Sequence, residues 1–379
     1  MRVAIDVTAL LPQMTGVDNY LVQLVLNLAK VDQRNEYLIV HNREDRRLFA
    51  DRLPRNFTLL PTSLRSRPIR LFAQQLALPL IARRWSADVL HSPSFIMPLY
   101  RGRQRHVLTV HDMSSFTMPE HHIPLRRSWP YRRAIVRSIL HADAVVVISD
   151  ATRQAICGIV PNVDRQRLHV IPLGINDEFH VYSAERVAAA RMRHGWPSSY
   201  ILYVGTIEPR KNLGRLVDSY AELVSSGDAP DRLLLAGKLG WGYEGLLRRL
   251  EEPDVKGRVQ ILGYVPQEEL PLLYSGATLF VYPSRLEGFG FPPLEAMACG
   301  VPTISSLSSS LAENLQGAAL LVPPDDGQAL TQAMREALRN GELRAKFEEA
   351  GLQRAARFRW EATARRTMQC YELVAGGAG

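Results

Sequence analysis

Short, largely uncharged apolar runs alternate with helix-forming segments along the chain, and this alternation constrains the fold more than any other feature. Seven such runs lie in the first half of the sequence and six in the second. Residues 233–236, Leu-Leu-Leu-Ala, are typical of a strand that is buried on both faces of a helix-covered parallel sheet. Strand–helix alternation that occurs twice predicts an α/β protein with two doubly wound domains.

The predicted elements can be given by their ranges. We expect strands over residues 3–7, 37–41, 57–60, 88–91, 106–111, 144–148 and 168–171, and then over 200–205, 232–236, 259–262, 278–282, 302–305 and 318–322. One helix is clear over residues 213–224, where apolar residues recur at spacings of three and four before Gly227. Apart from the serine-rich tract 305–310, the sequence holds no repeat or low-complexity segment.

The length of 379 residues fits two domains. Turn residues between positions 169 and 181 predict a boundary there, with domains over residues 1–175 and 176–359 and a helical tail over 360–379. Three widely spaced cysteines indicate neither a disulfide framework nor a zinc site. The chain begins Met-Arg-Val-Ala-Ile-Asp, which puts a charge inside the first apolar run. This is not typical of a secretory signal peptide, so we expect a cytoplasmic protein.

Basic residues are concentrated in the first half of the chain. Residues 1–180 hold 24 Lys and Arg against 15 Asp and Glu, whereas residues 181–379 hold 22 against 23. Residues 52–137 hold 15 Arg against three acids, and they include the apolar stretch 71–82 with arginines on both sides. As a helix, this stretch would span about 18 Å, short of the roughly 30 Å core of a bilayer.

An apolar stretch flanked by arginines predicts a peripheral protein on the cytoplasmic face of the inner membrane, held by an anionic membrane surface. Replacing Arg65, Arg67, Arg83 and Arg84 by Ser is expected to weaken such binding. The alternative is a soluble enzyme in which stretch 71–82 packs on the core and the arginines only solvate the surface. Nucleic acid is not expected as a partner, because the basic segment lacks regular aromatic interleaving and any known nucleic-acid motif.

The segment from Glu287 to Glu295, Glu-Gly-Phe-Gly-Phe-Pro-Pro-Leu-Glu, follows a predicted buried strand. Its glycines allow the backbone to approach a ligand, and its prolines suit the opening of a helix over 294–299, whose N-terminus favours an anion. Carboxylates accept hydrogen bonds from sugar hydroxyls, so the pair fits a sugar nucleotide. The alternative for Glu295, in the first turn of that helix, is that it only complements the helix dipole.

A second segment, residues 204–212, also follows a strand and precedes a helix. Arg210 and Lys211 would lie beside the helix N-terminus, where two cations can hold a diphosphate. A solvated basic turn is the alternative. Lys238, between glycines after the next strand, repeats the arrangement.

Two features of the first half point to the same edge of a sheet. Gly16 follows the first strand and opens a helix, and His111 ends the strand over 106–111. A histidine there could orient a sugar or help to move a proton. The alternatives are an ordinary strand–helix turn and a structural histidine.

Several enzyme classes lack their motifs in this chain. The sequence has no Gly-x-Gly-x-x-Gly at the first strand–helix turn and no Gly-x4-Gly-Lys-Ser/Thr, which argues against a dinucleotide oxidoreductase and a P-loop ATPase. It also has no Asp-x-Asp pair and no Gly-x-Ser-x-Gly, so neither that type of metal site nor an esterase nucleophile is indicated.

Together these motifs resemble those of the retaining glycosyltransferases of family 4. The pair Glu287 and Glu295 resembles the Glu-x7-Glu motif of that family, residues 208–212 resemble its diphosphate-binding segment, and residues 108–112 resemble the segment with its cleft histidine. The resemblance covers essentially the whole chain. It implies a GT-B fold, α/β with two doubly wound Rossmann-like domains facing across a cleft, and a C-terminal helix that crosses back to the first domain.

The resemblance also implies residue roles. Glu287, His111, Arg210 and Lys211 would be catalytic, with Glu287 holding the donor sugar and the two cations neutralising the diphosphate. Glu295 would bind the ribose. The full donor-binding set is Gly16, Thr206, Arg210, Lys211, Lys238, Tyr264, Val265, Glu287, Gly288, Phe289, Gly290, Phe291, Leu294 and Glu295. Within it, Tyr264 and Val265 would lie near the base, Gly16 with His111 would face sugar and acceptor, and Thr206 replaces an Arg that is frequent in the family.

The activity implied by the resemblance is retaining, metal-independent transfer of a sugar, best matched by mannose from GDP-mannose. The acceptor would be a glycan or a polyprenyl-diphosphate-linked glycan in cell-surface polysaccharide synthesis, and no cofactor beyond the nucleotide-sugar is expected. UDP- or dTDP-sugars as donors, and a nucleotide-sugar epimerase or hydrolase of the same fold, stay open. A non-catalytic sugar-nucleotide or nucleic-acid binding protein and a pyridoxal-phosphate phosphorylase are more distant alternatives.

Overall fold

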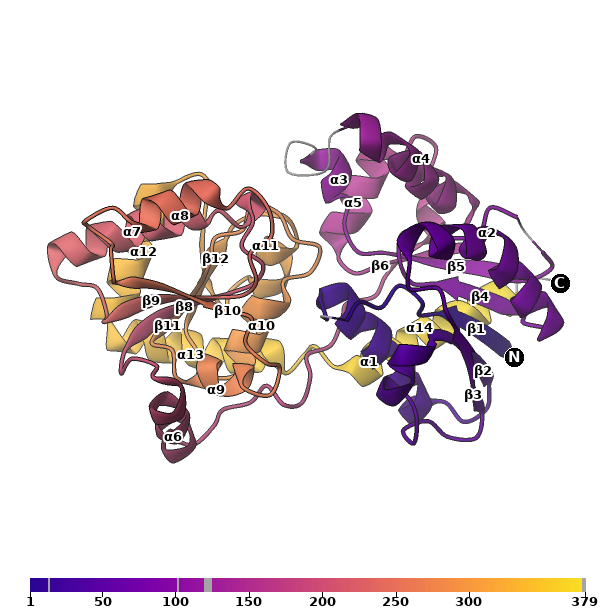
Figure 1. Cartoon of the computed structure of the whole chain (residues 1–379), viewed down its shortest axis with the longest axis horizontal. Coiled ribbons are helices and arrows are strands. Elements are labelled where there is room, and N and C mark those ends of the chain that lie inside the picture. Colours follow the sequence, from indigo (N-terminus) through magenta and orange to yellow (C-terminus); the bar gives the residue numbers. More distant parts are fainter. Residues whose placement is uncertain (13, 101, 119–124, 377–379) are drawn as a thin grey trace. The chain divides into compact units, whose positions relative to one another are not determined.

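The computed structural model describes residues 1–12, 14–100, 102–118 and 125–376 (Figure 1). The chain divides into two compact units. The first contains residues 1–174 together with the segment that begins at Arg359, and the second contains Ile175–Phe358. The chain therefore passes twice between the units, and its C-terminal helix belongs to the first.

The first unit is built on a seven-stranded sheet in the order β3-β2-β1-β4-β5-β6-β7, and every neighbouring pair is parallel. Its strands are β1 (Arg2–Asp6), β2 (Glu36–Asn42), β3 (Phe57–Thr62), β4 (Val89–Ser92), β5 (Arg105–Val110), β6 (Ala144–Val147) and β7 (Leu168–Val170). Its helices are α1 (Gly16–Val31), η1 (Arg43–Leu48), α2 (Arg67–Arg84), α3 (Ser114–Thr117), α4 (Leu125–His141), α5 (Asp150–Ile159), η3 (Arg165–Arg167) and α14 (Trp360–Gly376).

Helices cover both faces of this sheet. On one face, Leu78 and Ala82 of α2 pack with Leu90 of β4, while α4 and α5 pack over β5 and β6 through apolar side chains such as Ile139 and Ile156. On the other face, α14 lies along α1 and against β4, β5 and β6 (Figure 1). The strands are therefore buried on both sides, as their largely uncharged sequences predict.

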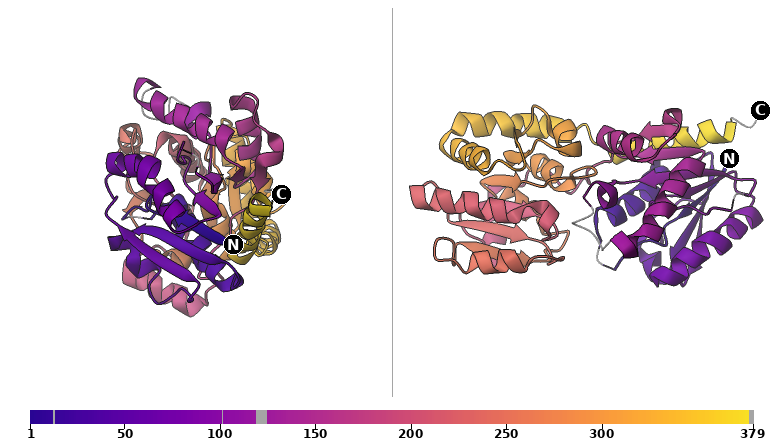
Figure 2. Two further views of the ribbon diagram at one scale, coloured as in Figure 1. Left: turned by 90° about the vertical axis from the view of Figure 1, so that its right-hand side faces the viewer. Right: turned by 90° about the horizontal axis from the view of Figure 1, so that it is seen from above.

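The second unit has a six-stranded parallel sheet in the order β10-β9-β8-β11-β12-β13. Its strands are β8 (Tyr200–Val204), β9 (Arg232–Ala236), β10 (Val259–Gly263), β11 (Leu279–Tyr282), β12 (Thr303–Ser306) and β13 (Leu320–Val322). Its helices are α6 (Ala184–His194), η4 (Pro209–Lys211), α7 (Leu213–Ser226), α8 (Glu244–Leu250), α9 (Leu270–Ser275), α10 (Phe291–Ala298), α11 (Ser309–Leu315), α12 (Gly327–Arg339) and α13 (Gly341–Ala355). Helices α7, α8 and α12 lie on one side of the second sheet and α9, α10 and α13 on the other (Figure 1), and Figure 2 gives two further views of these elements.

All thirteen predicted strands are confirmed within the described residues, and α7 ends at Gly227 as its apolar spacing predicts. One helix differs from expectation. Helix α10 begins at Phe291 rather than at position 294, because Gly290 takes a left-handed conformation with φ of 95° and caps it. The two prolines that follow then occupy the first turn, where no backbone N–H is needed.

Four buried side chains tie α14 and α1 to the first sheet. The hydroxyl of Tyr371 lies 2.7 Å from Nδ1 of His91, and Nε2 of His91 lies 2.8 Å from Oγ1 of Thr109, which lies 2.9 Å from the hydroxyl of Tyr20. All four residues have no exposed surface. Burial lowers the pKa of His91 to about 3, so its imidazole is neutral and serves only as a hydrogen-bonding bridge.

The point where α14 begins also requires a glycine. A Cβ added at Gly174 would lie 2.2 Å from the backbone nitrogen of Trp360, so no other residue fits there without a shift of the backbone. Trp360 is 4% exposed, and its ring lies 6.4 Å from that of Tyr20. The two chain passages are thus anchored in the first unit by a close backbone contact and a buried indole.

We predict that Tyr371→Phe lowers the stability of the first unit by about 1–3 kcal/mol, because it leaves Nδ1 of His91 without its partner in a site closed to water. Calorimetric unfolding measures the effect. Tyr100→Phe, at a residue that is 62% exposed, is the control and should leave the melting temperature unchanged. Equal melting temperatures for Tyr371→Phe and the unmodified protein would contradict the prediction.

Candidate active site

The sheet of the second unit reverses its strand order between β8 and β11. From β8 the order runs outward through β9 to β10, and from β11 it runs the other way through β12 to β13. The loops that follow β8 and β11 therefore diverge, and ligands of doubly wound sheets bind at such a reversal. Residues 205–212 and 283–290 are these two loops, and they carry seven of the 15 predicted site residues.

Arg210, Lys211 and Glu287 come together at this reversal. Nζ of Lys211 lies 2.6 Å from Oε1 of Glu287, and Nη1 of Arg210 lies 3.3 Å from Oε2. Glu208 contacts the same guanidinium, with its Oε1 2.8 Å from Nη2 of Arg210. We refer to Glu208, Arg210, Lys211 and Glu287 as the ionic cluster. Their side chains are between 8% and 17% exposed, so water screens their mutual attraction weakly.

Hydroxyl groups fix Glu287 from both its carboxylate and its backbone. Its Oε1 accepts hydrogen bonds from the hydroxyl of Tyr282 at 3.0 Å and from Oγ of Ser284 at 2.5 Å. Its backbone N–H donates to Oγ of Ser309 at 2.9 Å, and its carbonyl accepts from Oγ of Ser310 at 2.9 Å. The position of the carboxylate is therefore determined by groups from β11, from the loop that follows it and from the first turn of α11.

Sequence reasoning missed Ser309 and Ser310. Both lie in the serine-rich tract 305–310, which was the available signal, but its spacing does not say what the hydroxyls contact. Ser309 has φ of 44°, a left-handed conformation that is uncommon for a residue with a side chain and marks local strain. The tract reaches Glu287 because β11 and β12 are parallel neighbours, which brings the ends of both strands to one edge.

The charges of the ionic cluster hold Glu287 ionised. Burial by itself would raise the pKa of its carboxyl, but Lys211 and Arg210 outweigh burial and lower the pKa to about 2. Burial lowers the pKa of Lys211, and the charge of Glu287 offsets part of that shift. With two carboxylates and two cations, the cluster has no net charge of its own, so an incoming diphosphate can engage the cations only in competition with these carboxylates.

Glycines bring the loops after β8, β9 and β10 into contact. Gly205 donates to the carbonyl of Ala236 at 2.8 Å, and Gly237 donates to that of Gly263 at 2.7 Å. A Cβ added at Gly237 would lie 1.9 Å from the carbonyl oxygen of Gly205, which leaves room only for glycine. These glycines therefore extend the pairing of the sheet beyond the strand ends and set the position of the neighbouring Lys238.

Glu295 lies in the second turn of α10, not in the first, so the structure contradicts the alternative in which it only complements the helix dipole. Its Oε2 accepts a hydrogen bond from the hydroxyl of Tyr274 at 3.0 Å. Burial raises the pKa of Glu295 to about 7, with Glu178 adding to the rise and the Tyr274 hydrogen bond opposing it. Glu295 therefore changes its charge near neutral pH, whereas Glu287 does not.

Two other members of the Glu-x7-Glu segment point into the protein. Phe289 is 3% exposed and lies between Phe291 and Phe358, and Leu294 is completely buried. Gly288 and Phe291 are partly exposed. A Cβ at Gly290 would lie 2.7 Å from Cδ2 of Leu311 in α11. Glycine is therefore required at position 290 for packing as well as for the helix cap. A ligand could meet Phe289 and Leu294 only through their backbone.

The remaining donor-side residues lie farther out along the same sheet edge. Thr206 follows β8 and is partly exposed, and Lys238 follows β9 with an exposed side chain. Tyr264 and Val265 follow the edge strand β10, and Tyr264 is 56% exposed. The carboxyl ends of β10, β9, β8 and β11 thus present these residues in one row from Tyr264 to Glu287.

In the first unit, Gly16 is the first residue of α1, next to the capping residue Thr15. His111 follows β5 and is 4% exposed, with its ring packed against Tyr20 and Phe95. Its Nε2 lies 3.0 Å from the carbonyl oxygen of Pro93, which can only accept, so Nε2 carries the hydrogen and Nδ1 is an acceptor. Burial lowers the pKa of His111, and the imidazole is neutral.

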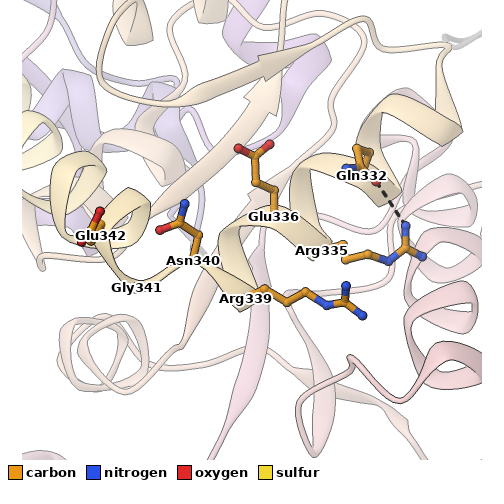
Figure 3. A pocket seen from close by; sticks show the side chains of 7 residues that line it. All are labelled: Gln332, Arg335, Glu336, Arg339, Asn340, Gly341 and Glu342. Atoms are coloured by element: carbon orange, nitrogen blue, oxygen red, sulfur yellow. Dashed lines mark hydrogen bonds between the residues drawn. The ribbon is translucent and has the colours of Figure 1, made fainter.

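A surface hollow of about 640 Å³ lies elsewhere in the second unit, between the end of α12 and the start of α13. Figure 3 shows Arg335 and Arg339 pointing to the same side of α12, where both pair with Asp228 at the end of α7. Because helices run back against the strands, the ends of α7 and α12 lie at the opposite sheet edge from the ionic cluster. The hollow is therefore separate from the candidate site.

Among the residues that the structure describes, no group of three or more His, Cys, Asp or Glu could hold a metal ion.

Comparison with known proteins assigns the chain to a family. Residues 14–179 match the family model described as Glycosyltransferase Family 4, and residues 191–354 match that described as Glycosyl transferases group 1. The O-antigen chain mannosyltransferase B of Escherichia coli is 32% identical over 377 residues, which cover 95% of this chain and 97% of that protein. The protein belongs to glycosyltransferase family 4. The resemblance that the Glu-x7-Glu segment indicates is thereby confirmed.

Solved structures agree with the fold of this family 4 glycosyltransferase. The sucrose-phosphate synthase of Thermosynechococcus elongatus has a TM-score of 0.80 over 100% of both chains at 22% identity. Anabaena HepE in complex with UDP and glucose has a TM-score of 0.75 at 17% identity, covering 97% of this chain and 98% of the other. With the two doubly wound parallel sheets, these likenesses confirm the GT-B fold class.

If Glu295 accepts hydrogen bonds from a donor ribose, donor affinity should depend on pH near neutrality. As pH falls through about 7, Glu295 takes up a proton and is a poorer acceptor, so the KM for the donor should rise. Glu295→Gln should remove this dependence. In the unmodified protein the hydrogen bond from Tyr274 lowers the pKa of Glu295, so Tyr274→Phe should raise that pKa and shift the dependence to higher pH. Initial rates measured across the pH range decide the matter, and an unchanged profile in Glu295→Gln would contradict the assignment.

Proposed function

We propose that this family 4 glycosyltransferase transfers mannose from GDP-mannose to a glycan or a polyprenyl-diphosphate-linked glycan in cell-surface polysaccharide synthesis, on the cytoplasmic side of the membrane. The observation that carries the proposal is the ionic cluster at the strand-order reversal, where Arg210 and Lys211 lie beside the ionised Glu287. The choice of mannose is supported by the 32% identity to an O-antigen chain mannosyltransferase over nearly the whole chain.

The cations would serve the departing diphosphate. Glycosyl transfer breaks the bond between C1 of the sugar and the diphosphate oxygen, which leaves negative charge on the diphosphate and positive charge on the sugar. Arg210 and Lys211 would donate hydrogen bonds to the diphosphate, and fixed donors aimed at a developing charge lower the barrier. Because this role needs no divalent cation, we propose that transfer is independent of metal ions.

Glu287 would hold the sugar as a permanent anion. Its pKa of about 2 means that it does not act as a general acid near neutral pH, and it is available to accept hydrogen bonds from sugar hydroxyls. Its carboxylate also faces the positive charge that develops on the sugar ring. The hydroxyls of Ser284, Ser309 and Ser310 would keep it in that position through the reaction.

Retention of configuration would follow from attack on the same face of the sugar. The acceptor hydroxyl oxygen forms the new bond to C1, and its proton passes to the diphosphate oxygen that leaves. The other donor residues would bind without taking part in bond changes: Glu295 the ribose, Tyr264 and Val265 the base, and Lys238 with Thr206 the phosphates. We propose that Gly16 and the neutral His111 of the first unit serve the sugar and acceptor.

Lys211→Ala should lower kcat about 100-fold or more with a smaller change in donor KM, since the diphosphate gains charge as the bond breaks. Glu295→Ala should instead raise donor KM and leave kcat nearly unchanged. Lys211→Ala removes one of the two cations beside a buried carboxylate, so its fold must be verified by circular dichroism. Lys211→Arg, which keeps the charge, should recover part of the turnover. The roles are wrongly assigned if Lys211→Ala retains full turnover while Glu295→Ala abolishes it.

The proposed donor can be tested by thermal unfolding in the presence of EDTA. GDP-mannose should raise the melting temperature more than UDP- or dTDP-sugars, and at a hundredfold excess over Kd the stabilisation should be about 2.7 kcal/mol. A product assay with GDP-mannose and EDTA completes the experiment. Stabilisation by a UDP- or dTDP-sugar alone would overturn the GDP-mannose proposal, and activity that returns only with Mg²⁺ or Mn²⁺ would overturn metal independence.

A further inference from the structure

One face of α2 carries large apolar side chains that the fold leaves uncovered. Ile69, Phe72, Leu76 and Leu80 are 57%, 69%, 54% and 51% exposed. Their spacings of three, four and four residues place them in one line along the helix. The opposite face of α2 is buried against the sheet through Leu78 and Ala82, so the stripe is additional to the side that packs on the core.

A neighbouring loop extends the stripe. The side chain of Gln75, on α2, accepts a hydrogen bond from the backbone of Leu99 at 2.9 Å and donates to the carbonyl of Met97 at 3.2 Å. These bonds hold residues 97–100 beside α2, where Leu99 is 39% and Tyr100 is 62% exposed. We call Ile69, Phe72, Leu76, Leu80, Leu99 and Tyr100 the α2 surface.

The chain segment that contains α2 carries charged residues of one sign. Residues 52–87 contain seven Arg and no Asp or Glu. Arg83 and Arg84 follow Leu80 by three and four residues, so they continue the line of the stripe, and both are exposed. Arg65 has a different role, because it pairs with Asp45 at 2.8 Å and donates to the carbonyl of Leu10 at 2.6 Å. Of Arg65, Arg83 and Arg84, the structure therefore leaves Arg83 and Arg84 for lipid contact, and the side chain of Arg67 lies outside the described residues.

We propose that the α2 surface docks the protein on an anionic lipid bilayer, with the apolar stripe at the boundary of headgroups and acyl chains and Arg83 and Arg84 on lipid phosphates. Contiguous exposed apolar side chains that end in arginines match what an interfacial helix requires. None of the described helices is long and apolar enough to cross a membrane. The proposal does not depend on which sugar is transferred.

A second copy of the chain is a poorer occupant. A two-fold dimer through the α2 surface would bring two arginine-rich segments without acids against each other, and the repulsion between them would have no compensation from carboxylates of the same segment. A bilayer with anionic headgroups offers the opposite charge along the whole face. Charge complementarity therefore favours the membrane over self-association.

Co-sedimentation of the full chain with vesicles tests the proposal. Vesicles of phosphatidylcholine with phosphatidylglycerol should bind the protein, pure phosphatidylcholine should bind it much less, and added salt should release it. The double variants Phe72→Ser with Leu76→Ser, and Arg83→Ser with Arg84→Ser, should each lower the partition coefficient about tenfold or more. Matched controls on the second unit are Met192→Ser with Leu247→Ser, and Arg186→Ser with Arg248→Ser, which should bind like the unmodified chain.

Equal binding to both vesicle types, no binding to either, or full binding by both α2 double variants would overturn the proposal. Sedimentation velocity without lipid tests whether a second copy of the chain covers the α2 surface. If the unmodified protein is a dimer and the variant with Phe72→Ser and Leu76→Ser is a monomer, the surface is assigned to a second copy. Thermal unfolding verifies that each variant folds. Donor-induced stabilisation that persists when vesicle binding fails would overturn docking alone and leave the proposed transferase activity standing.

Discussion

The contact between Lys211 and Glu287, with their charged atoms 2.6 Å apart and little water around them, is the interaction on which the site of this protein depends. Removal of one partner from a buried pair typically costs about 3–5 kcal/mol, because the other charge remains desolvated. Here the pair joins two loops that leave β8 and β11 in different directions. The contact therefore connects the loop after β8 with the loop after β11, and Arg210 and Glu208 of the ionic cluster lie beside it.

Such a pair is stable only when its remaining hydrogen-bonding capacity is met, and the structure shows how this is done. Tyr282 and Ser284 donate to the carboxylate, and the first two residues of α11 hold the backbone of Glu287 through its N–H and its carbonyl. Arg210 supplies a second cation and is itself held by Glu208. The result is a rigid, electrically balanced group of side chains.

Glu287 and Glu295 show how one motif can hold two carboxyls with different properties. Both are shielded from water, but only Glu287 has cations beside it, so its pKa falls to about 2 while that of Glu295 rises to about 7. Their separation of eight residues places one in a loop and the other in the second turn of α10. The two carboxyls therefore differ in how they respond to pH: Glu287 stays an anion near neutrality, whereas Glu295 changes its charge there.

The sequence by itself determined the thirteen strands, their parallel arrangement in two sheets and the family, because uncharged strands alternating with helices and the segment from Glu287 to Glu295 are local patterns that few folds accommodate. It also placed Arg210 and Lys211 at a strand end. What only the tertiary structure decided are contacts between segments far apart in the chain: Ser309 and Ser310 on Glu287, Tyr274 on Glu295, and the uncovered stripe of α2. Periodicity marks which residues of a helix are apolar, but which apolar side chains stay exposed depends on what packs against them, and that is set only when the sheets and helices assemble.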